Sequence, residues 1–165
     1  MIFVSYGTEE YLFERLTSNI HSIINNNKYY KEEFVLQMGQ SYNEKYNSNK
    51  NVIAFRYCTN DSFNKYVEDA RIIITHGGVG SIITALSRGK IPIVIPRYKK
   101  YGEQVDDHQT QIVNEFSSKN YIISFSENSQ LEYLLDNYDA IVKHLNKYVH
   151  EDSSISRHIN DKYFT

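Results

Sequence analysis

Two short apolar runs constrain the fold more than any other part of this sequence. Ile72–Ile74 and Ile91–Ile95 carry apolar side chains at every position. Successive side chains of a strand point to opposite faces of its sheet, so a strand that is apolar throughout needs cover on both faces. The apolar stretch Val79–Ser87 lies between the two runs and has the length of a helix. This strand–helix–strand order is typical of an α/β fold with a mainly parallel sheet.

The same alternation of apolar runs and helical stretches extends along the whole chain. Helices are predicted where apolar residues recur every three or four positions. We expect an α/β domain, with a Rossmann-like, mainly parallel sheet of about six strands and helices on both faces. The expected strands are Ile2–Ser5, Phe34–Gln37, Val52–Phe55, Arg71–Thr75, Ile91–Ile95 and Tyr121–Ile123. The expected helices are Glu9–Ile24, Phe63–Glu68, Val79–Ser87, Gln109–Phe116 and Leu131–Leu145.

Length and composition indicate one globular domain. The chain has 165 residues, of which 41% are hydrophobic, enough for one core. We expect a single domain over residues 1–165, with a core at about 1–146 and a polar tail at 147–165. The first apolar run has no basic stretch before it, and no run reaches the roughly 18 apolar residues of a membrane helix. These patterns predict a cytoplasmic protein.

Charge and cysteine content exclude several classes of partner and cofactor. The chain has 18 basic and 20 acidic side chains, a net charge of −2, so it lacks the excess of basic residues that bulk binding to nucleic acid requires. Cys58 is the one cysteine, and no Cys/His cluster has zinc spacing. The sequence also lacks an Asp-x-Asp pair that could hold Mg²⁺ on a diphosphate. We therefore expect neither nucleic acid nor a metal cofactor.

The most informative motif is Thr75–Ser81, with the sequence Thr-His-Gly-Gly-Val-Gly-Ser between a buried strand and a helix. Glycines let backbone amides approach a ligand closely, and a helix N-terminus offers unpaired N–H groups. At the carboxyl edge of a parallel sheet, these features predict a phosphate site. The alternative is a tight turn without a ligand. A dinucleotide fingerprint is excluded because position 83 is Ile83, and a P-loop is excluded because no Gly-Lys-Ser/Thr sequence follows.

Two further segments are expected at the same edge of the sheet. Pro96–Gln109 follows the second apolar strand, and it gathers donors and acceptors suited to sugar hydroxyls and an anion. The alternative is a solvated charged loop in which Asp106 or Asp107 caps the next helix. The pair Gly7-Thr8 follows the first strand, and here a turn with a helix cap is the simpler interpretation.

Taken together, these residues resemble the C-terminal domain of glycosyltransferase family 28. The resemblance runs from the opening strand and its turn, Phe3–Thr8, to about Phe116. It is carried further by His76–Ser81, Gly89-Lys90 with Pro92, Pro96-Arg97, Gly102-Glu103 and Asp107-His108-Gln109. Within the family, the chain is similar to small stand-alone donor-binding subunits. These are the cytosolic subunit of the two-part N-acetylglucosaminyltransferase of dolichol-linked oligosaccharide synthesis and bacterial capsule or exopolysaccharide counterparts.

The resemblance implies one half of a GT-B fold that holds a UDP-sugar. The residues implied for the donor diphosphate are Gly7, Thr8, His76, Gly77, Gly78, Val79, Gly80 and Ser81. The residues implied for the donor sugar and ribose are Arg97, Glu103, Asp107, His108 and Gln109. Thr84 departs from the family pattern, since many relatives carry a glutamate there that holds the ribose hydroxyls. Glu103 is a substitute for that glutamate by hypothesis.

The chemistry expected from these residues is metal-free, inverting transfer of a sugar. The leaving-group charge would be met by backbone amides, a helix terminus, His76 and Arg97. Inversion needs a base for the acceptor hydroxyl, for which Glu103 and His108 are the candidates by chemistry alone. We assign no catalytic base, because the resemblance places acceptor binding in the other half of the enzyme. Galactose, glucuronic acid and N-acetylglucosamine all remain open as the donor sugar.

We therefore expect a donor-binding subunit that works with a membrane-anchored, acceptor-binding partner subunit on a lipid-linked saccharide acceptor. The expected location is the cytoplasm, at the inner face of the membrane, where the partner holds the chain. The expected contact surface includes the apolar stripe of Leu131–Leu145 and the segment Tyr148–Phe164, although the stripe also suits packing against the sheet. One alternative is a UDP-binding regulatory module without turnover. A second alternative is a dehydrogenase-like Rossmann domain, which the positions of the glycines disfavour.

Overall fold

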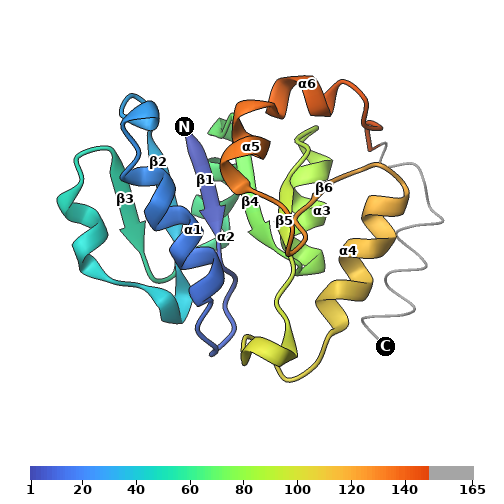
Figure 1. Ribbon diagram of the computed structural model, residues 1–165, viewed down its shortest axis with the longest axis horizontal. Coiled ribbons are helices and arrows are strands. Elements are labelled where there is room, and N and C mark those ends of the chain that lie inside the picture. The colour runs from blue at the N-terminus through green and yellow to red at the C-terminus, as the bar shows by residue number, and fades with distance from the viewer. Residues whose placement is uncertain (149–165) are drawn as a thin grey trace.

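The computed structural model describes residues 1–148, which are arranged around one six-stranded sheet (Figure 1). Every neighbouring pair of strands is parallel, and the order across the sheet is β3-β2-β1-β4-β5-β6. The prediction of a six-stranded, mainly parallel sheet is thus confirmed. The strands are β1 (Ile2–Ser5), β2 (Phe34–Gln37), β3 (Val52–Phe55), β4 (Ile72–His76), β5 (Ile93–Ile95) and β6 (Ile123–Ser124).

The strand order creates a crevice at the centre of the sheet. The chain first builds outward from β1 through β2 to β3, and then returns to place β4 on the other side of β1. Phe3 in β1 therefore lies opposite both Val35 in β2 and Ile73 in β4. The connections after β1 and β4 leave the sheet in opposite directions. Ligands of open α/β sheets bind in the crevice that such a reversal opens at the carboxyl ends of the strands.

Helices cover both faces of the sheet, as predicted. On one face α1 (Glu14–Ile24), α5 (Leu131–Asp136) and α6 (Tyr138–Val142) cover the larger apolar core, which includes Val4 and Ile74. On the other face lie α2 (Asn60–Asp69), α3 (Val79–Ser87) and α4 (His108–Ser118), which pack against residues such as Phe3 and Val94. Figure 1 shows α1 and α5 in front of the sheet and α2 behind it. Short 3₁₀ turns are η1 (Asn27–Tyr29), η2 (Gly39–Ser41), η3 (Glu44–Ser48) and η4 (Lys99–Tyr101).

Three helix predictions were wrong in extent by three residues or more. Helix α2 begins at Asn60, three residues earlier than expected. The first helix begins at Glu14, five residues later than expected. The preceding residues form a loop, in which Phe13 donates its N–H to Ser41 Oγ at 2.8 Å. The expected helix over 131–145 is two helices, α5 and α6, which meet at Asn137. The Asn137 side chain donates to the carbonyl of Tyr133 at 2.9 Å, the kind of local bond by which asparagine favours helix ends.

The apolar stripe of Leu131–Leu145 belongs to the core. Leu131, Leu135 and Tyr138 are buried in the cluster beneath α1, with their neighbours packed against it. Tyr138 also donates its hydroxyl to the carbonyl of Ile91 at 2.7 Å. The expectation that this stripe contacts a partner is therefore corrected, because the sheet already covers it. The segment Tyr148–Phe164 lies outside the described residues except for Tyr148, whose ring packs edge-on against Tyr121.

No helix within residues 1–148 combines the length and the apolar character needed to cross a membrane.

Candidate functional site

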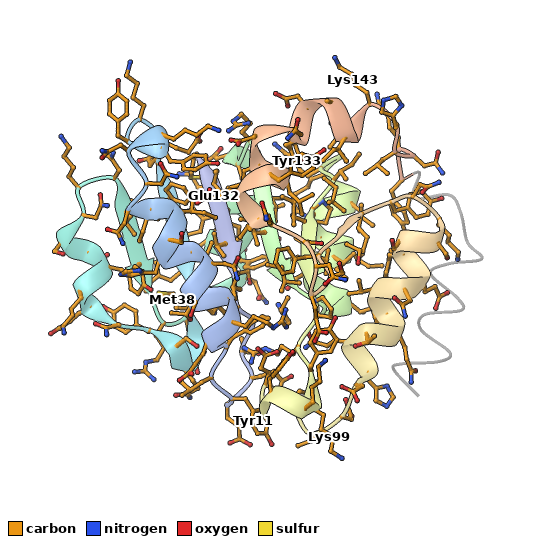
Figure 2. All side chains as sticks on the ribbon, viewed as in Figure 1. Tyr11, Met38, Lys99, Glu132, Tyr133 and Lys143 are labelled. Atoms are coloured by element: carbon orange, nitrogen blue, oxygen red, sulfur yellow. The ribbon has the colours of Figure 1, made fainter. Side chains whose placement is uncertain are left out.

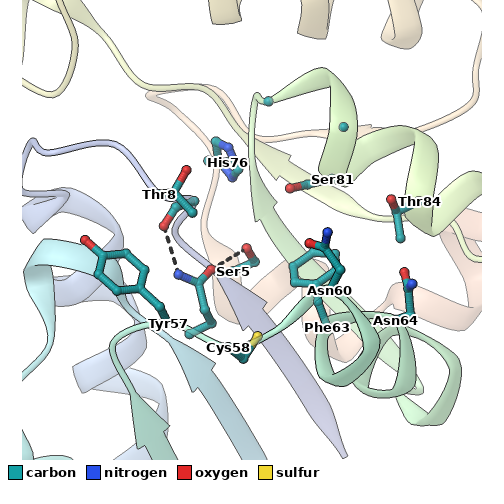
Figure 3. Close-up of a pocket in the computed structure, with 14 residues that line it drawn as sticks. Ser5, Thr8, Tyr57, Cys58, Asn60, Phe63, Asn64, His76, Ser81 and Thr84 are labelled. Atoms are coloured by element: carbon teal, nitrogen blue, oxygen red, sulfur yellow. Dashed lines mark hydrogen bonds between the residues drawn. The ribbon is translucent and has the colours of Figure 1, made fainter.

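A cavity of about 530 Å³ lies at the carboxyl ends of β1 to β4, where the strand order reverses. Figure 3 shows side chains from both halves of the sheet facing into it. Of the residues that the sequence predicts for a diphosphate, six line this cavity. They are Gly7, Thr8, His76, Gly78, Gly80 and Ser81. The structure therefore brings together the turn after β1 and the turn after β4, as expected.

The turn after β4 presents the N-terminus of α3 to the cavity. Strand β4 ends at His76, and α3 begins at Val79 with Gly78 as its N-cap. The first helical bond runs from Ile82 N–H to the Gly78 carbonyl. The amides of residues 79, 80 and 81 thus have no acceptor within the described chain. Three unpaired N–H groups at the positive end of a helix form a ready anion site.

The two glycines at the start of α3 serve different purposes. A Cβ on Gly78 would lie 2.3 Å from His76 Nε2, so the close approach of the imidazole requires glycine there. A Cβ on Gly80 would meet nothing within 4 Å. Gly80 therefore keeps the mouth of the site open and is not required by packing.

His76 lies between the two turns with 8% of its surface exposed. Burial, and then the positive charge of Arg97, lower the pKa of its imidazole to about 4, although a hydrogen bond to the backbone of Ser5 acts in the opposite direction. His76 is consequently neutral at pH 7. It can offer a hydrogen bond to a ligand at that pH but no formal charge.

The turn after β1 approaches the same imidazole. Gly7 has φ +83°, and a Cβ on it would lie 2.7 Å from His76 Nε2. The Gly7 carbonyl accepts a hydrogen bond from Gln37 Nε2 at 2.9 Å, and Ser5 Oγ donates to Gln37 Oε1 at 2.8 Å (Figure 3). Neither Gly7 nor Thr8 donates its backbone N–H to another described residue. The turn is thus held through its carbonyl, and Gly7 and Thr8 line the cavity.

The third wall comes from the loop after β3 and from α2, and none of its residues was predicted as part of the site. Its side chains are Tyr57, Cys58, Asn60, Phe63 and Asn64. Asn60 and Asn64 lie one helical turn apart, and Figure 3 shows Asn64 facing Thr84 of α3 across the cavity. No described residue hydrogen-bonds the side chains of these two asparagines or of Thr84. A detectable signal was the polar run Cys58-Thr59-Asn60, where Thr59 caps α2 by accepting from Ser62 N–H at 3.2 Å.

The lining of the cavity contains no charged side chain. Burial raises the pKa of the Cys58 thiol, which favours its neutral form. Among residues 1–148, no three His, Cys, Asp or Glu side chains gather closely enough to hold a metal ion. The cavity therefore presents backbone amides and neutral hydrogen-bonding groups to an anion.

Two predicted residues of the glycine turn lie behind the cavity. Gly77 donates its N–H to Gln109 Oε1 at 2.9 Å, so this amide is already used. Val79 packs its side chain into the core beneath α3 and α4. Gln109 is itself buried, and its Oε1 also accepts from Arg97 N–H at 3.1 Å. Gln109, which was expected to contact a donor sugar, thus uses its amide oxygen to join the turn after β4 to the loop after β5.

Arg97 and Glu103 are also placed differently from the expectation. Arg97 is 2% exposed, and its guanidinium donates to backbone carbonyls. Glu103 is 3% exposed and accepts from Arg15, at 2.9 Å for the closer pair, and from Tyr98 N–H at 3.0 Å. Neither lines the cavity. Their predicted contacts with sugar and ribose are corrected, because both side chains are committed to fixing loops.

The rest of the loop after β5 is exposed at the same end of the molecule. Figure 2 shows Lys99 of this loop and Tyr11 of the loop after β1 at this end of the molecule. Asp107 Oδ1 accepts from Lys99 N–H at 3.0 Å, and Asp106 Oδ1 accepts from His108 N–H at 3.0 Å. Asp106 thus satisfies an amide at the start of α4, as the alternative interpretation of this segment predicted. Asp107 and His108 stand outside the cavity lining, and their contacts with a donor stay predictions.

Comparisons with known proteins agree with this geometry. The model of the glycosyltransferase family 28 C-terminal domain matches residues 1–158. A curated relative, the UDP-N-acetylglucosamine transferase subunit ALG13 of Candida albicans, is 40% identical over 93 residues, which are 56% of this chain and 29% of that protein. The chain therefore covers less than a third of this relative.

Solved structures share the fold. The NMR structure of ALG13 superposes with a TM-score of 0.65 at 19% identity, covering 99% of this chain and 96% of that one. The glycosyltransferase SnogD from Streptomyces nogalater gives a TM-score of 0.51 at 22% identity, covering 86% of this chain and 36% of that one. The six-stranded parallel sheet with its helices matches the fold of the Rossmann-like half of GT-B glycosyltransferases. On the match over residues 1–158, this chain belongs to the family of the glycosyltransferase family 28 C-terminal domain.

Proposed function

We propose that this chain is the donor-binding, catalytic subunit of an inverting, metal-independent UDP-sugar glycosyltransferase. The observation that carries the proposal is the cavity at the β1/β4 crevice, where the turn after β1 and the N-terminus of α3 converge. This arrangement suits a diphosphate, because both sets of donors are unpaired and the helix dipole favours negative charge. The name of the ALG13 relative, a UDP-N-acetylglucosamine transferase subunit, supports UDP as the nucleotide.

In this proposal the nucleoside occupies the wall formed by α2 and the loop after β3. Tyr57 and Phe63 offer aromatic surface for a pyrimidine ring. The side chains of Asn60, Asn64 and Thr84 offer donors and acceptors for the base edge and the ribose hydroxyls. These neutral groups take the place of the ribose-binding glutamate of many relatives, since Glu103 is bound to Arg15 elsewhere.

The transfer step follows from the same donors. As the bond between sugar and diphosphate breaks, negative charge grows on the leaving phosphate, and preorganised amides stabilise that charge without a metal ion. The acceptor hydroxyl attacks the sugar from the opposite side and loses its proton to a base. Glu103 is unsuited to be that base because its carboxylate is buried and already paired. We propose that the base belongs to a partner subunit.

We further propose that the partner is membrane-anchored and binds a lipid-linked saccharide acceptor for capsule or exopolysaccharide synthesis. A GT-B active site lies between two α/β halves, and the described residues form one such half. The ALG13 relative is itself a transferase subunit, which supports a two-part enzyme. The chain would then act at the cytoplasmic face of the membrane, held there by its partner.

The nucleotide assignment is tested by Gly80→Val, measured by calorimetric titration with UDP. Valine at this position has room in the fold but fills the mouth of the cavity, so UDP binding should be lost while the thermal midpoint is retained. Ser87→Val is the matched control, because it places the same side chain at an exposed position of the same helix. Unchanged UDP affinity in Gly80→Val would refute the assignment.

Turnover is tested separately by reconstitution. The purified chain with UDP-sugar and lipid-linked acceptor should release no UDP until membranes that carry the partner are added. Release should then require the acceptor. Transfer by the isolated chain would contradict the two-subunit proposal. UDP binding without acceptor-dependent release in the complete system would favour a regulatory nucleotide-binding module.

A further inference from the structure

Arg97 is a buried cation that holds a backbone loop. Its Nη2 donates to the carbonyl of Tyr6 at 2.8 Å, and its Nη1 donates to the carbonyls of Glu103, Tyr11 and Leu12 at 3.0, 3.2 and 3.3 Å. Three of these four acceptors belong to the segment that connects β1 to α1. No acidic side chain of the described chain forms an ion pair with Arg97.

Burying a charged side chain costs free energy, and an apolar side chain could fill the same space at a lower cost. The presence of arginine here therefore needs a specific explanation. The planar guanidinium offers several N–H groups in a fixed fork, which a lysine lacks. It also lies against the Phe13 ring, 4.4 Å from the ring centroid, which fixes its plane. The site thus uses the shape of arginine as well as its charge.

The carbonyl of Tyr6 links Arg97 to the cavity. The peptide between Tyr6 and Gly7 is planar and trans, so the Gly7 N–H points away from the Tyr6 carbonyl and hence away from Arg97. The next peptide is fixed in the same way, because the Gly7 carbonyl accepts from Gln37 and the Thr8 N–H points away from it. Gly7 has φ +83° and is conformationally permissive, so these two anchors decide where its amides point.

We propose that Arg97 is a positioning residue for the phosphate part of the site, which acts by holding the Tyr6–Gly7 peptide so that the amides of Gly7 and Thr8 face the ligand. The proposal rests on UDP binding as proposed above. Arg97 itself stays outside the cavity lining. Its charge nevertheless reaches the site, since it contributes to the lowered pKa of His76.

The test compares UDP with uridine, which lacks the phosphates, by NMR titration of the full chain. Arg97→Lys keeps the charge and removes the fork, so it separates positioning from simple attraction. We expect the UDP dissociation constant to rise at least tenfold, while that of uridine changes less than twofold. Phe13→Leu, which loosens the guanidinium without replacing it, should give a smaller loss with the same selectivity. If Arg97→Lys does not fold, Phe13→Leu serves as the test variant in its place.

Arg15→Gln is the matched control. Arg15 holds the loop after β5, which carries Arg97, through Glu103 and the carbonyl of Pro96, and it makes no hydrogen bond to Tyr6. It should lower the thermal midpoint and leave the ratio of UDP to uridine affinity unchanged. Equal losses for the two ligands, or unchanged UDP affinity in both test variants, would overturn the role of Arg97 and leave UDP binding standing. Failure of the wild-type chain to bind UDP would overturn the proposed function and this inference with it.

Discussion

Acidification from pH 7 to pH 5 should destabilise the fold through His76. The pKa of the imidazole is about 4 in the folded chain, against an ordinary value of 6.5. Between these values the unfolded chain binds a proton that the folded chain excludes, so the free energy of unfolding falls as the pH falls. Above about pH 6.5 both states are neutral, and the contribution of His76 is constant.

The magnitude follows from the two pKa values. Each pH unit that separates them is worth about 1.4 kcal/mol, so the full effect is about 3 kcal/mol once the pH lies below both. About 2 kcal/mol of this loss falls between pH 7 and pH 5. Glu32 titrates in a different pH range. Burial raises its pKa, but hydrogen bonds from Arg71 and the N-terminus lower it, and the net effect is a pKa below the ordinary 4.5. Its contribution is therefore lost below about pH 4.5.

Urea denaturation followed by circular dichroism at pH 7, 6 and 5 measures the effect. His76→Asn removes the titrating group, and each protein is compared with itself, so any pH-independent cost of the substitution cancels. The wild-type chain should lose about 2 kcal/mol between pH 7 and 5, and the variant clearly less. An equal loss in both proteins would show that His76 is not held neutral by burial, and the account of the site given above would fail.

Three other substitutions or treatments test separate parts of the account. Gln109→Ala should lower both the thermal midpoint and UDP affinity, because the N–H groups of Gly77 and Arg97 lose their acceptor at about 1–3 kcal/mol each; a loss confined to UDP-sugars would instead indicate direct contact with the sugar. Transfer in the reconstituted system should survive EDTA, and inhibition that Mg²⁺ or Mn²⁺ reverses would contradict amide-based stabilisation. Leu135→Asp should unfold the chain in calorimetry, since Leu135 is 6% exposed, whereas Tyr133→Asp at 60% exposure should not; a folded Leu135→Asp chain that only fails to bind the partner would restore the stripe as a docking surface.

The sheet could be predicted because its strands are defined locally. Runs such as Ile72–Ile74 are rich in β-branched residues, and the turn signals beside them fix their ends within a residue or two. Helix α3 was likewise bounded by Gly78 and Arg88 as expected. The start of α1 was missed because distant groups decide it. The carbonyls of Tyr11 and Leu12 bond Arg97, more than eighty positions away in the chain.

The site was half predictable for a related reason. The glycine turns after β1 and β4 carry a local pattern, and parallel strands bring their carboxyl ends to one edge. The wall from α2 depends on β3 standing two strands from β1, which no local pattern indicates. The burial of Arg97, Glu103 and Gln109 was not predicted, because a charged or polar residue in a loop is usually exposed. Their burial follows from contacts with Tyr6, Arg15 and Gly77 that only the tertiary structure reveals.

The cavity is built from five helices and strands and the loops between them, and its lining residues extend from Ser5 to Thr84. None of it survives unfolding, so a nucleotide that occupies it binds the native state alone. By mass action, a ligand at a hundred times its dissociation constant then adds about 2.7 kcal/mol of stability. For a domain of this size the melting temperature would rise by roughly 5–10 °C. Thermal denaturation can therefore rank nucleotides and nucleotide sugars as ligands with no acceptor, no partner and no assay of transfer.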